Sequence, residues 1–198
     1  MDRGYEAVAI GVSTGGLRAL EGILFHLPAD FALPLLIVQH VDRDAGSGLA
    51  QLLDARCALK VKEADDQDEI VAGTAYLAPA NYHLLVESRE RLTLSVDPHV
   101  SFARPSIDVL FESAADVFGP RLIGVVLTGA NFDGSDGLKR VKQRGGLAIV
   151  QEPSEAAASQ MPRAALAATE VDHVVPLAGI APLLEQLAAA SAAAQRTA

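Results

Sequence analysis

A serine in a glycine-rich turn is the first residue of this chain that could do chemistry. Ser13 follows the apolar run Ala7–Val12, and Gly15 and Gly16 come next, where an amphipathic helical pattern begins. A turn of this kind between a strand and a helix is typical of two sites. One holds a phosphate group with backbone N–H groups at the helix N-terminus, and the other presents a nucleophilic hydroxyl beside an oxyanion hole.

The phosphate-binding alternative lacks two features that a dinucleotide site requires. Its fingerprint is Gly-x-Gly-x-x-Gly after the first strand, with an acidic residue about twenty positions later at the end of the second strand. Here Ser13 stands two positions after Gly11, and the next apolar run ends at Gln39 and His40, with Asp42 just beyond. The Gly-Lys-Ser/Thr of a P-loop is also missing from the sequence. A nucleotide-binding module is therefore the less favoured alternative.

The nucleophilic alternative needs a base, and His40 is the candidate. It follows the apolar run Pro34–Gln39, at the carboxyl end of a predicted strand. Carboxyl ends of neighbouring parallel strands open on the same crevice, so His40 and Ser13 can face each other. A histidine that only caps a strand is the alternative, but the strand-end position favours the base. The N–H of Thr14 and the helix N-terminus are expected to face the developing oxyanion, and the two glycines to leave room for substrate.

A third group must orient the imidazole, and the segment Thr128–Gly137 offers two aspartates. Asp136 fits the N-cap of the helix that follows, because apolar and basic residues come directly after it. Asp133 is therefore modestly favoured as the partner of His40. The order Ser, His, Asp matches none of the three familiar orders of hydrolase triads, which argues against an ordinary α/β-hydrolase.

These candidates need a scaffold that brings the ends of separate strands together. Strand-sized apolar runs alternate with amphipathic helical patterns, which is typical of a parallel sheet covered on both faces. Two short runs, His83–Glu87 and Leu92–Val96, are joined by a polar tip and predict an antiparallel hairpin. We therefore expect one α/β domain over residues 1–198, a doubly wound, mainly parallel sheet with helices on both faces and the antiparallel hairpin at one edge. The predicted parallel strands are Ala7–Val12, Pro34–Gln39, Arg121–Thr128, Leu147–Gln151 and His173–Pro176, and the alanine-rich tail at 188–198 is expected to be a fraying helix.

Composition narrows the classes of partner and compartment. The net charge of −9 argues against a nucleic-acid surface, because neutralising phosphates requires clustered Lys and Arg. The single cysteine, Cys57, allows no intramolecular disulfide, and its neighbours favour a half-buried structural thiol. The acidic run at 63–69 has no histidine nearby and is expected to be a solvated loop rather than a metal site. No basic leader or long apolar stretch is present, so we expect a cytoplasmic protein that does not insert into a membrane.

The motifs together, in this order, make the sequence similar to the catalytic domain of the CheB-type chemotaxis protein-glutamate methylesterases. The resemblance extends over nearly the whole chain and implies a Ser-His-Asp triad on a parallel α/β sheet. It rests on AIGVSTGG (9–16), VQH (38–40), AYLAPANYHL (75–84), RPSIDVLFES (104–113), VVLTGANFDGSDGL (125–138), RGGLAIVQ (144–151) and MPRAAL (161–166).

The resemblance also implies an activity and a role for each candidate residue. The activity is hydrolysis of γ-glutamyl methyl esters on methyl-accepting chemotaxis receptors or related methylated signalling proteins, with deamidation of receptor glutamines as a second reaction. Carried over by motif, Ser13 is the nucleophile, His40 the general base and Asp133 the aspartate that holds His40. The Thr14 N–H is implied as an oxyanion donor, and Ala130 stands near the oxyanion site where the family commonly has methionine. No metal or organic cofactor is implied. A catalytically silent adaptor that binds receptors or other signalling proteins is the alternative function.

Two departures from the family pattern carry further expectations. The family's aspartate loop typically reads Thr-Gly-Met-Gly-x-Asp-Gly, whereas this chain has Ala130 and Asn131. Asparagine is the best non-glycine substitute if position 131 requires a positive φ, so we expect the triad to stay intact and Ala130 to leave room that methionine would fill. His83 matches a family histidine near the mouth of the site and is expected to be structural. The family archetype has an N-terminal receiver domain, which needs many more residues than precede the first predicted strand. We expect no receiver domain, and a separate response regulator is a candidate partner.

Overall fold

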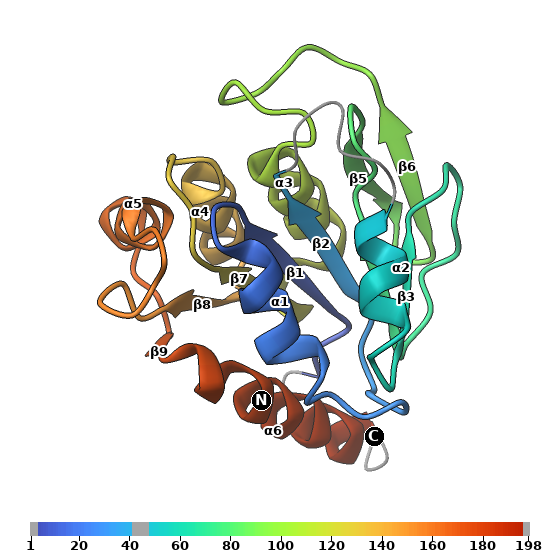
Figure 1. Cartoon of the computed structure of the whole chain (residues 1–198). Coiled ribbons are helices and arrows are strands. Elements are labelled where there is room, and N and C mark those ends of the chain that lie inside the picture. Colours follow the sequence, from blue (N-terminus) through green and yellow to red (C-terminus); the bar gives the residue numbers. More distant parts are fainter. Residues whose placement is uncertain (1–3, 41–47, 196–198) are drawn as a thin grey trace.

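The computed structural model describes residues 4–40 and 48–195, which fold around a seven-stranded sheet (Figure 1). The strand order is β3-β4-β2-β1-β7-β8-β9, and every neighbouring pair in it is parallel. Strand β1 lies at the centre, so the loops that follow β1, β2 and β7 leave the sheet at the same edge. The strands are β1 (Ala7–Val12), β2 (Leu35–Gln39), β3 (Lys60–Glu63), β4 (Thr74–Leu77), β7 (Leu122–Val126), β8 (Leu147–Gln151) and β9 (His173–Val175).

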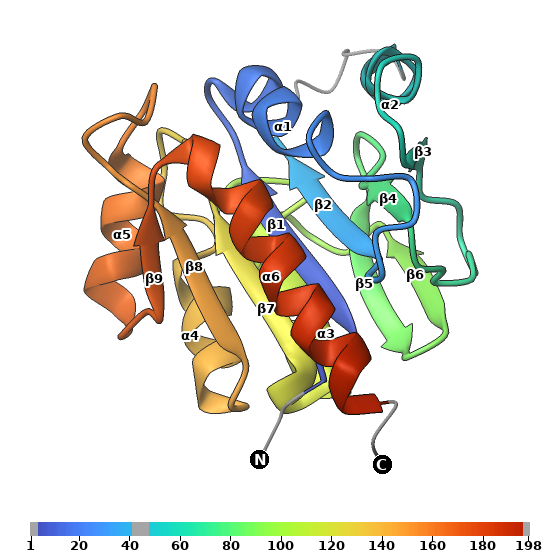
Figure 2. The same cartoon turned by 90° about the horizontal axis from the view of Figure 1, so that it is seen from below.

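Helices cover both faces of this sheet, as Figures 1 and 2 show. Side chains of a strand alternate between the two faces, and β1 illustrates this: Val8 and Ile10 belong to one core, Ala7 and Ala9 to the other. The first core includes α1 (Gly16–Leu24), α2 (Gly48–Asp54) and α6 (Leu177–Gln195), and the second includes α3 (Ile107–Phe118), α4 (Ser135–Gln143) and α5 (Gln160–Ala168). A short 3₁₀ turn, Gly119–Arg121, leads from α3 into β7. The predicted parallel α/β fold with helices on both faces is confirmed.

The predicted hairpin is present as β5 (His83–Ser88) and β6 (Arg91–Ser95), which pair antiparallel. It forms a two-stranded sheet of its own rather than continuing the hydrogen-bonded ladder at the edge of the large sheet. The reason is its packing: the apolar side chains of the hairpin join the core that α3 shares, and the Val86 N–H donates to Ser113 Oγ on α3 at 3.1 Å. The hairpin therefore fixes the position of α3, whose N-terminus matters for the site.

Strand β3 is an element that the sequence pattern did not predict. Of its four residues only Val61 is buried, and the other three carry charges. A strand at the edge of a sheet needs few apolar residues, so its hydrophobic signal is weak. The acidic run that follows does lie at the surface in part, and Lys62 Nζ pairs with Asp65 and Asp68 at 3.0 and 2.7 Å.

The alanine-rich C-terminal segment is helical as far as Gln195. Ala188 and Ser191 are buried, and Ser191 Oγ accepts a hydrogen bond from the Tyr5 N–H at 2.8 Å. This part of the expected fraying helix thus packs against the first strand region, and residues 196–198 of the predicted tail lie outside the described residues. Within the described ranges, no helix combines the length and the apolar character needed to cross a membrane.

Candidate active site

The loops after β1, β2 and β7 bring the predicted site residues together. Ser13 directly follows β1, His40 directly follows β2, and Asp133 lies in the loop between β7 and α4. Because β2, β1 and β7 are neighbours in the sheet, these loops leave the same edge side by side. Ser13 and His40 line one cavity of about 460 Å³. Asp42, which the nucleotide alternative would use, lies outside the described residues.

The imidazole of His40 is bound to the carboxylate of Asp133. The distance from His40 Nε2 to Asp133 Oδ2 is 2.7 Å, and the Asp133 side chain is fully buried. Burial alone raises the pKa of Asp133, but hydrogen bonds from His40 and from the N–H groups of Ile107 and Asp108 outweigh it and hold that pKa below its usual range. Asp133 is therefore an ionised carboxylate, shielded from solvent, that binds the imidazole.

The N-terminus of α3 holds the Asp133 carboxylate from the other side. The Ile107 N–H donates to Oδ2 at 2.7 Å, the Asp108 N–H donates to Oδ1 at 3.0 Å, and the Ser106 hydroxyl donates to Oδ1 at 2.8 Å. Ser106 is the residue that precedes α3. The free N–H groups and the positive end of the helix dipole both favour a negative charge here. Together with His40, these groups make four hydrogen-bond donors, which hold the carboxylate in a single orientation.

Asp108 completes a reciprocal arrangement between two helices. Its Oδ1 accepts the N–H groups of Gly134 and Gly137, at 2.9 and 2.7 Å, at the start of α4. Asp133, just before α4, thus caps α3, and Asp108, in the first turn of α3, caps α4. Burial raises the pKa of Asp108 to about 7, and the charge of Asp133 adds to this although the two N–H donors oppose it. The two carboxylates lock together the loops on which the site depends.

Sequence reasoning missed Ser106 and Asp108. The usable signal was Ser-Ile-Asp ahead of an apolar helical run, which is typical of a helix N-terminus. The sequence pattern also predicted Asp136 as the N-cap of α4, and this prediction is wrong. The residue preceding α4 is Gly134, with φ of +95°, and Asp136 is an exposed residue of the first turn. Asp136 is not needed as a cap because Asp108, distant in sequence, accepts those N–H groups.

The second ring nitrogen of His40 is the one available for proton transfer. With the Nε2 proton donated to Asp133, the neutral ring carries a lone pair on Nδ1. Asn131 Nδ2 lies 3.4 Å from that atom. Among the hydrogen bonds of the described residues, none joins Ser13 Oγ to His40; in free enzymes such contacts often tighten only when substrate binds. The shared cavity places both groups within reach of one substrate.

Asn131 is held by side-chain contacts rather than by an unusual backbone. It is absent from the described non-glycine residues with positive φ, so position 131 does not require the left-handed conformation for which asparagine would be the best substitute. Instead, Asn131 Oδ1 accepts the Asp133 N–H at 3.2 Å while its amide group approaches His40. The residue therefore bridges the aspartate loop and the imidazole.

The glycines after Ser13 serve the turn and its packing. Gly15 has φ of +80°, which disfavours side chains, and it precedes α1. A Cβ on Gly16 would come within 1.7 Å of Gln39 Oε1, so Gly16 leaves space for the Gln39 side chain. Gln39 Nε2 uses this position to donate to the carbonyl oxygens of Ser13 and His40, at 3.0 and 2.8 Å. That side chain ties together the ends of β1 and β2. Gly15 and Gly16 also line a cavity of about 770 Å³ together with Ser13, so their predicted role in leaving room for substrate stays a prediction.

Hydrogen bonds fix the peptide groups on both sides of Thr14. The Ser13 carbonyl accepts from the Gly16 N–H at 2.9 Å and from Gln39, and the Thr14 carbonyl accepts from Thr128 Oγ1 at 2.8 Å. These bonds fix the planar peptide groups on both sides of Thr14, and a trans peptide directs its N–H away from the preceding carbonyl. Among the described residues, no acceptor binds this N–H. Its predicted role as an oxyanion donor stays a prediction.

Ala130 and its neighbours border the same region. A Cβ on Gly129 would lie 3.0 Å from Ser13 Cβ, so this loop runs directly against the serine. Gly129 itself is anchored, because its N–H donates to Ala158 at 2.9 Å and its carbonyl accepts from Met161 at 3.0 Å. Ala130 is exposed, and its N–H has no acceptor within the described part of the chain. It stays a second candidate for the oxyanion site.

Two further residues have the structural roles that the sequence predicted. His83 is buried; its Nδ1 accepts the Ser106 N–H at 3.2 Å and its Nε2 donates to the Pro98 carbonyl at 3.1 Å. Cys57 is half-buried, and burial raises the pKa of its thiol to about 11, which disfavours the nucleophilic thiolate. No set of three or more His, Cys, Asp and Glu side chains in the described segments could hold a metal ion.

Comparison with known proteins gives one consistent family. A family model described as CheB methylesterase matches residues 8–184. A relative from Leptospira interrogans, named putative protein-glutamate methylesterase/protein-glutamine glutaminase, is 49% identical over 183 residues, which cover 92% of this chain and 95% of the relative. Protein-glutamate methylesterase FrzG from Myxococcus xanthus is 40% identical over 182 residues, covering 92% of this chain and 54% of that protein.

A relative from Geobacillus kaustophilus, named protein-glutamate methylesterase/protein-glutamine glutaminase, is 44% identical over 184 residues. They cover 91% of this chain and 53% of that protein, so the chain spans about half the length of this relative and of the Myxococcus protein. Among solved structures, the CheB methylesterase catalytic domain of Thermotoga maritima matches with a TM-score of 0.88 at 33% identity. The match covers 92% of this chain and 98% of that domain.

Proposed function

The chain belongs to the CheB methylesterase family, and we propose that it hydrolyses γ-glutamyl methyl esters of methyl-accepting chemoreceptors through an acyl-enzyme on Ser13. The observation that carries the proposal is the 2.7 Å bond between His40 Nε2 and the buried Asp133 carboxylate, beside the cavity that Ser13 shares. This bond leaves Nδ1 as the basic atom of the His40 ring. A serine hydroxyl needs such a base to act as a nucleophile.

In the first half of the reaction the glutamyl acyl group is transferred to the enzyme. His40 Nδ1 takes the Ser13 hydroxyl proton while Oγ forms a bond to the ester carbonyl carbon. The oxyanion that develops is stabilised by the Thr14 N–H, with Ala130 N–H as the second candidate donor. The bond from carbon to the methoxy oxygen then breaks, and the proton on His40 passes to that oxygen, so methanol leaves and a glutamyl ester of Ser13 remains.

In the second half, water repeats the sequence. His40 removes a proton from water as the water oxygen attacks the acyl carbon, and His40 then passes that proton to Ser13 Oγ as the bond from Oγ to the acyl carbon breaks. The product leaves as the glutamic acid side chain, which releases its remaining proton to solvent and becomes the carboxylate. Asp133 keeps its charge throughout and stabilises the transient imidazolium. Neither half needs a metal or an organic cofactor.

Deamidation of receptor glutamines is proposed as a second reaction of the same site. A glutamine presents a carbonyl carbon in the same position, and its leaving group is ammonia rather than methanol. The names of the relatives, which combine methylesterase and glutaminase, support this extension. The proposed partners are chemoreceptors or related methylated signalling proteins, with a separate response regulator as a further candidate and the cytoplasm as the predicted compartment.

Methanol release from a methylated receptor tests the function. A chemoreceptor signalling fragment carrying radiolabelled methyl groups is incubated with the wild-type chain and with Ser13→Ala. We expect the wild type to release labelled methanol and Ser13→Ala to release none, while both bind the receptor in a pull-down. A catalytically silent adaptor is indicated instead if neither protein releases methanol and both bind, and this result would refute the proposed reaction.

A further inference from the structure

Two phenylalanine side chains at the mouth of the catalytic cavity are exposed to solvent. Phe102 is 95% exposed and Phe132 is 55% exposed. They lie on different loops, one between β6 and α3 and the other between β7 and α4, yet both line the cavity that Ser13 and His40 share. Apolar surface gathered beside a cavity is typical of a binding site.

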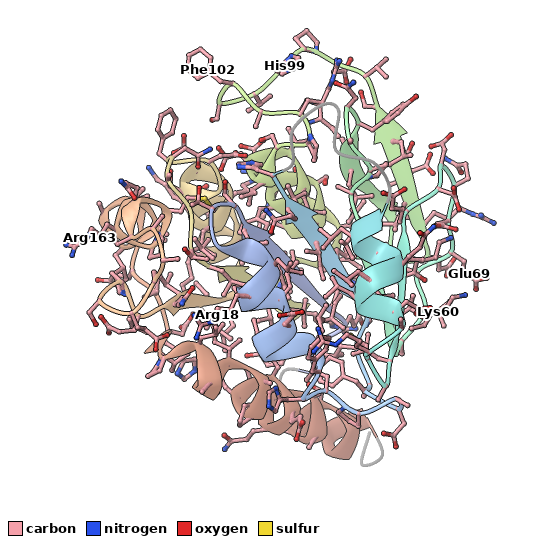
Figure 3. All side chains as sticks on the ribbon, in the orientation of Figure 1. Arg18, Lys60, Glu69, His99, Phe102 and Arg163 are labelled. Atoms are coloured by element: carbon pink, nitrogen blue, oxygen red, sulfur yellow. The ribbon has the colours of Figure 1, made fainter. Side chains whose placement is uncertain are left out.

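The backbone under Phe102 is held in an unfavourable conformation. Ser101 and Phe102 have φ of +51° and +63°, in the left-handed region that most side chains avoid. Their neighbours Val100 and Ala103 exchange two backbone hydrogen bonds, of 3.2 and 2.9 Å, which close this turn. Figure 3 shows the Phe102 side chain at the outer side of the loop. This turn therefore leaves the Phe102 ring exposed to solvent rather than packed against the core.

Two bonds within the same loop and one from β5 hold it in place. Arg104 Nη1 donates to the carbonyl oxygens of Val96 and Asp97, at 2.7 and 3.0 Å, and His83 binds the Pro98 carbonyl. Arg104 lines the cavity too; the two bonds occupy its Nη1, while its buried Nε has no hydrogen-bond partner among the described residues. The mouth next to Phe102 thus offers an incoming chain apolar surface held on an anchored loop.

We propose that Phe102 and Phe132, together called the docking rim, bind apolar side chains of the protein substrate next to the esterified glutamate; this rests on the proposed function. The reacting carbonyl must reach Ser13 inside a cavity of about 460 Å³, which has room for a side chain and not for a folded protein. The residues beside the modified glutamate therefore stay at the mouth, where the two rings lie. Covering an exposed aromatic ring with apolar side chains is favourable, and it happens only with a protein substrate.

Paired substrates separate substrate docking from chemistry. The two are the methylated receptor fragment and the γ-methyl ester of N-acetylglutamate amide, a small ester without neighbouring residues. For Phe102→Ala and Phe132→Ala we expect kcat/KM on the methylated fragment to fall about tenfold each, mainly through KM. The values for the small ester stay within twofold. Phe102→Leu, which keeps an apolar side chain, is expected to recover most of the activity on the fragment.

Val174→Ala is the matched control, because Val174 is 41% exposed on β9 and does not line the cavity. It should leave both substrates unaffected. Unchanged kinetics of both rim variants on the fragment would overturn the proposal, and so would an equal loss on the two substrates, since the rings would then act on the chemistry. A dimer of the wild type that Phe102→Ala dissociates, without a change in KM, would assign the rim to self-association instead. A wild type that hydrolyses neither substrate overturns the proposed function itself, and the rim proposal with it.

Discussion

Replacing Asp133 by asparagine is the sharpest test of the candidate triad, because the structure states what the new amide would meet. Oδ2 of Asp133 accepts from His40 Nε2 and the Ile107 N–H, both at 2.7 Å. Oδ1 accepts from the Ser106 hydroxyl and the Asp108 N–H, at 2.8 and 3.0 Å. An asparagine has one oxygen, so in either orientation its NH₂ group faces a backbone N–H that cannot rotate away.

The loss of stability follows from that clash of donors. Leaving a buried donor without an acceptor costs about 1–3 kcal/mol. For a domain of this size each kcal/mol lowers Tm by about 2–4 °C, so a decrease of roughly 2–12 °C is expected. The protein stays folded, and activity can be measured at a temperature well below the new transition.

The loss of activity is larger. With the amide nitrogen toward His40, Nε2 becomes an acceptor and Nδ1 carries the proton, so the base is lost; with the oxygen toward His40, the imidazolium loses its negative partner. By analogy with serine hydrolases, kcat is expected to fall roughly 10³- to 10⁴-fold, or about 4–5.5 kcal/mol of transition-state stabilisation. Methanol release from the methylated receptor fragment measures kcat, and circular dichroism on heating measures Tm.

Asp136→Asn is the matched control, because Asp136 is an exposed aspartate three positions along the same segment. We expect its activity to stay within twofold of the wild type and its Tm within about 2 °C. Full activity in Asp133→Asn together with an inactive Asp136→Asn would refute the assignment of the triad aspartate. A large fall in Tm with no fall in kcat would show that Asp133 has only a structural role.

Four further predictions concern Asp108, Gly16 and Cys57. Asp108→Ala leaves two buried N–H groups at the start of α4 without an acceptor. It should lower the free energy of unfolding by about 2–4 kcal/mol, measured by urea titration. Asp108→Asn keeps an acceptor at Oδ1 and stays folded. Burial raises the pKa of Asp108 to about 7, so the folded state keeps a proton that the unfolded chain loses near pH 4. The contribution of this group to wild-type stability therefore falls as pH rises from 4 to 7. The unfolding free energy of Asp108→Asn minus that of the wild type should increase over this range, and a flat difference would contradict the raised pKa. Gly16→Ala should displace the Gln39 side chain that bridges the β1 and β2 ends and lower kcat about tenfold, with Tm reported in parallel; unchanged kcat would mean that this bridge is dispensable. Cys57→Ser should leave kcat unchanged and the wild-type thiol should react slowly with iodoacetamide at pH 7.5, since burial raises its pKa to about 11.

Much of the fold could be predicted from local patterns. Continuous apolar runs such as those of β1 and β2 identify buried parallel strands, because such strands are covered on both faces. The weak pattern of β3 failed because an edge strand buries only Val61. The hairpin was recognisable from its polar tip, but its separation from the large sheet depends on packing against α3, which no local pattern contains.

The sequence by itself determined which side chains can meet at the site. Ser13 and His40 each follow an apolar strand, and parallel strands bring their carboxyl ends to one edge whatever the loops contain. The choice between Asp133 and Asp136 was different, because both fit the same short segment and each is a plausible helix cap. Only the tertiary structure decided it, by placing the N-terminus of α3 against one carboxylate.

The same physical reason explains what else was missed. Ser106 and Asp108 are helix-start residues whose partners lie more than twenty positions away in sequence, and hydrogen bonds of that kind leave no periodic or spacing signal. The contact between Gly16 and the Gln39 side chain is of the same kind, because nothing in the local sequence pairs these two positions. Strand and helix positions follow from local burial and backbone preference, whereas the orientation of each polar group depends on the donors and acceptors that the fold brings to it.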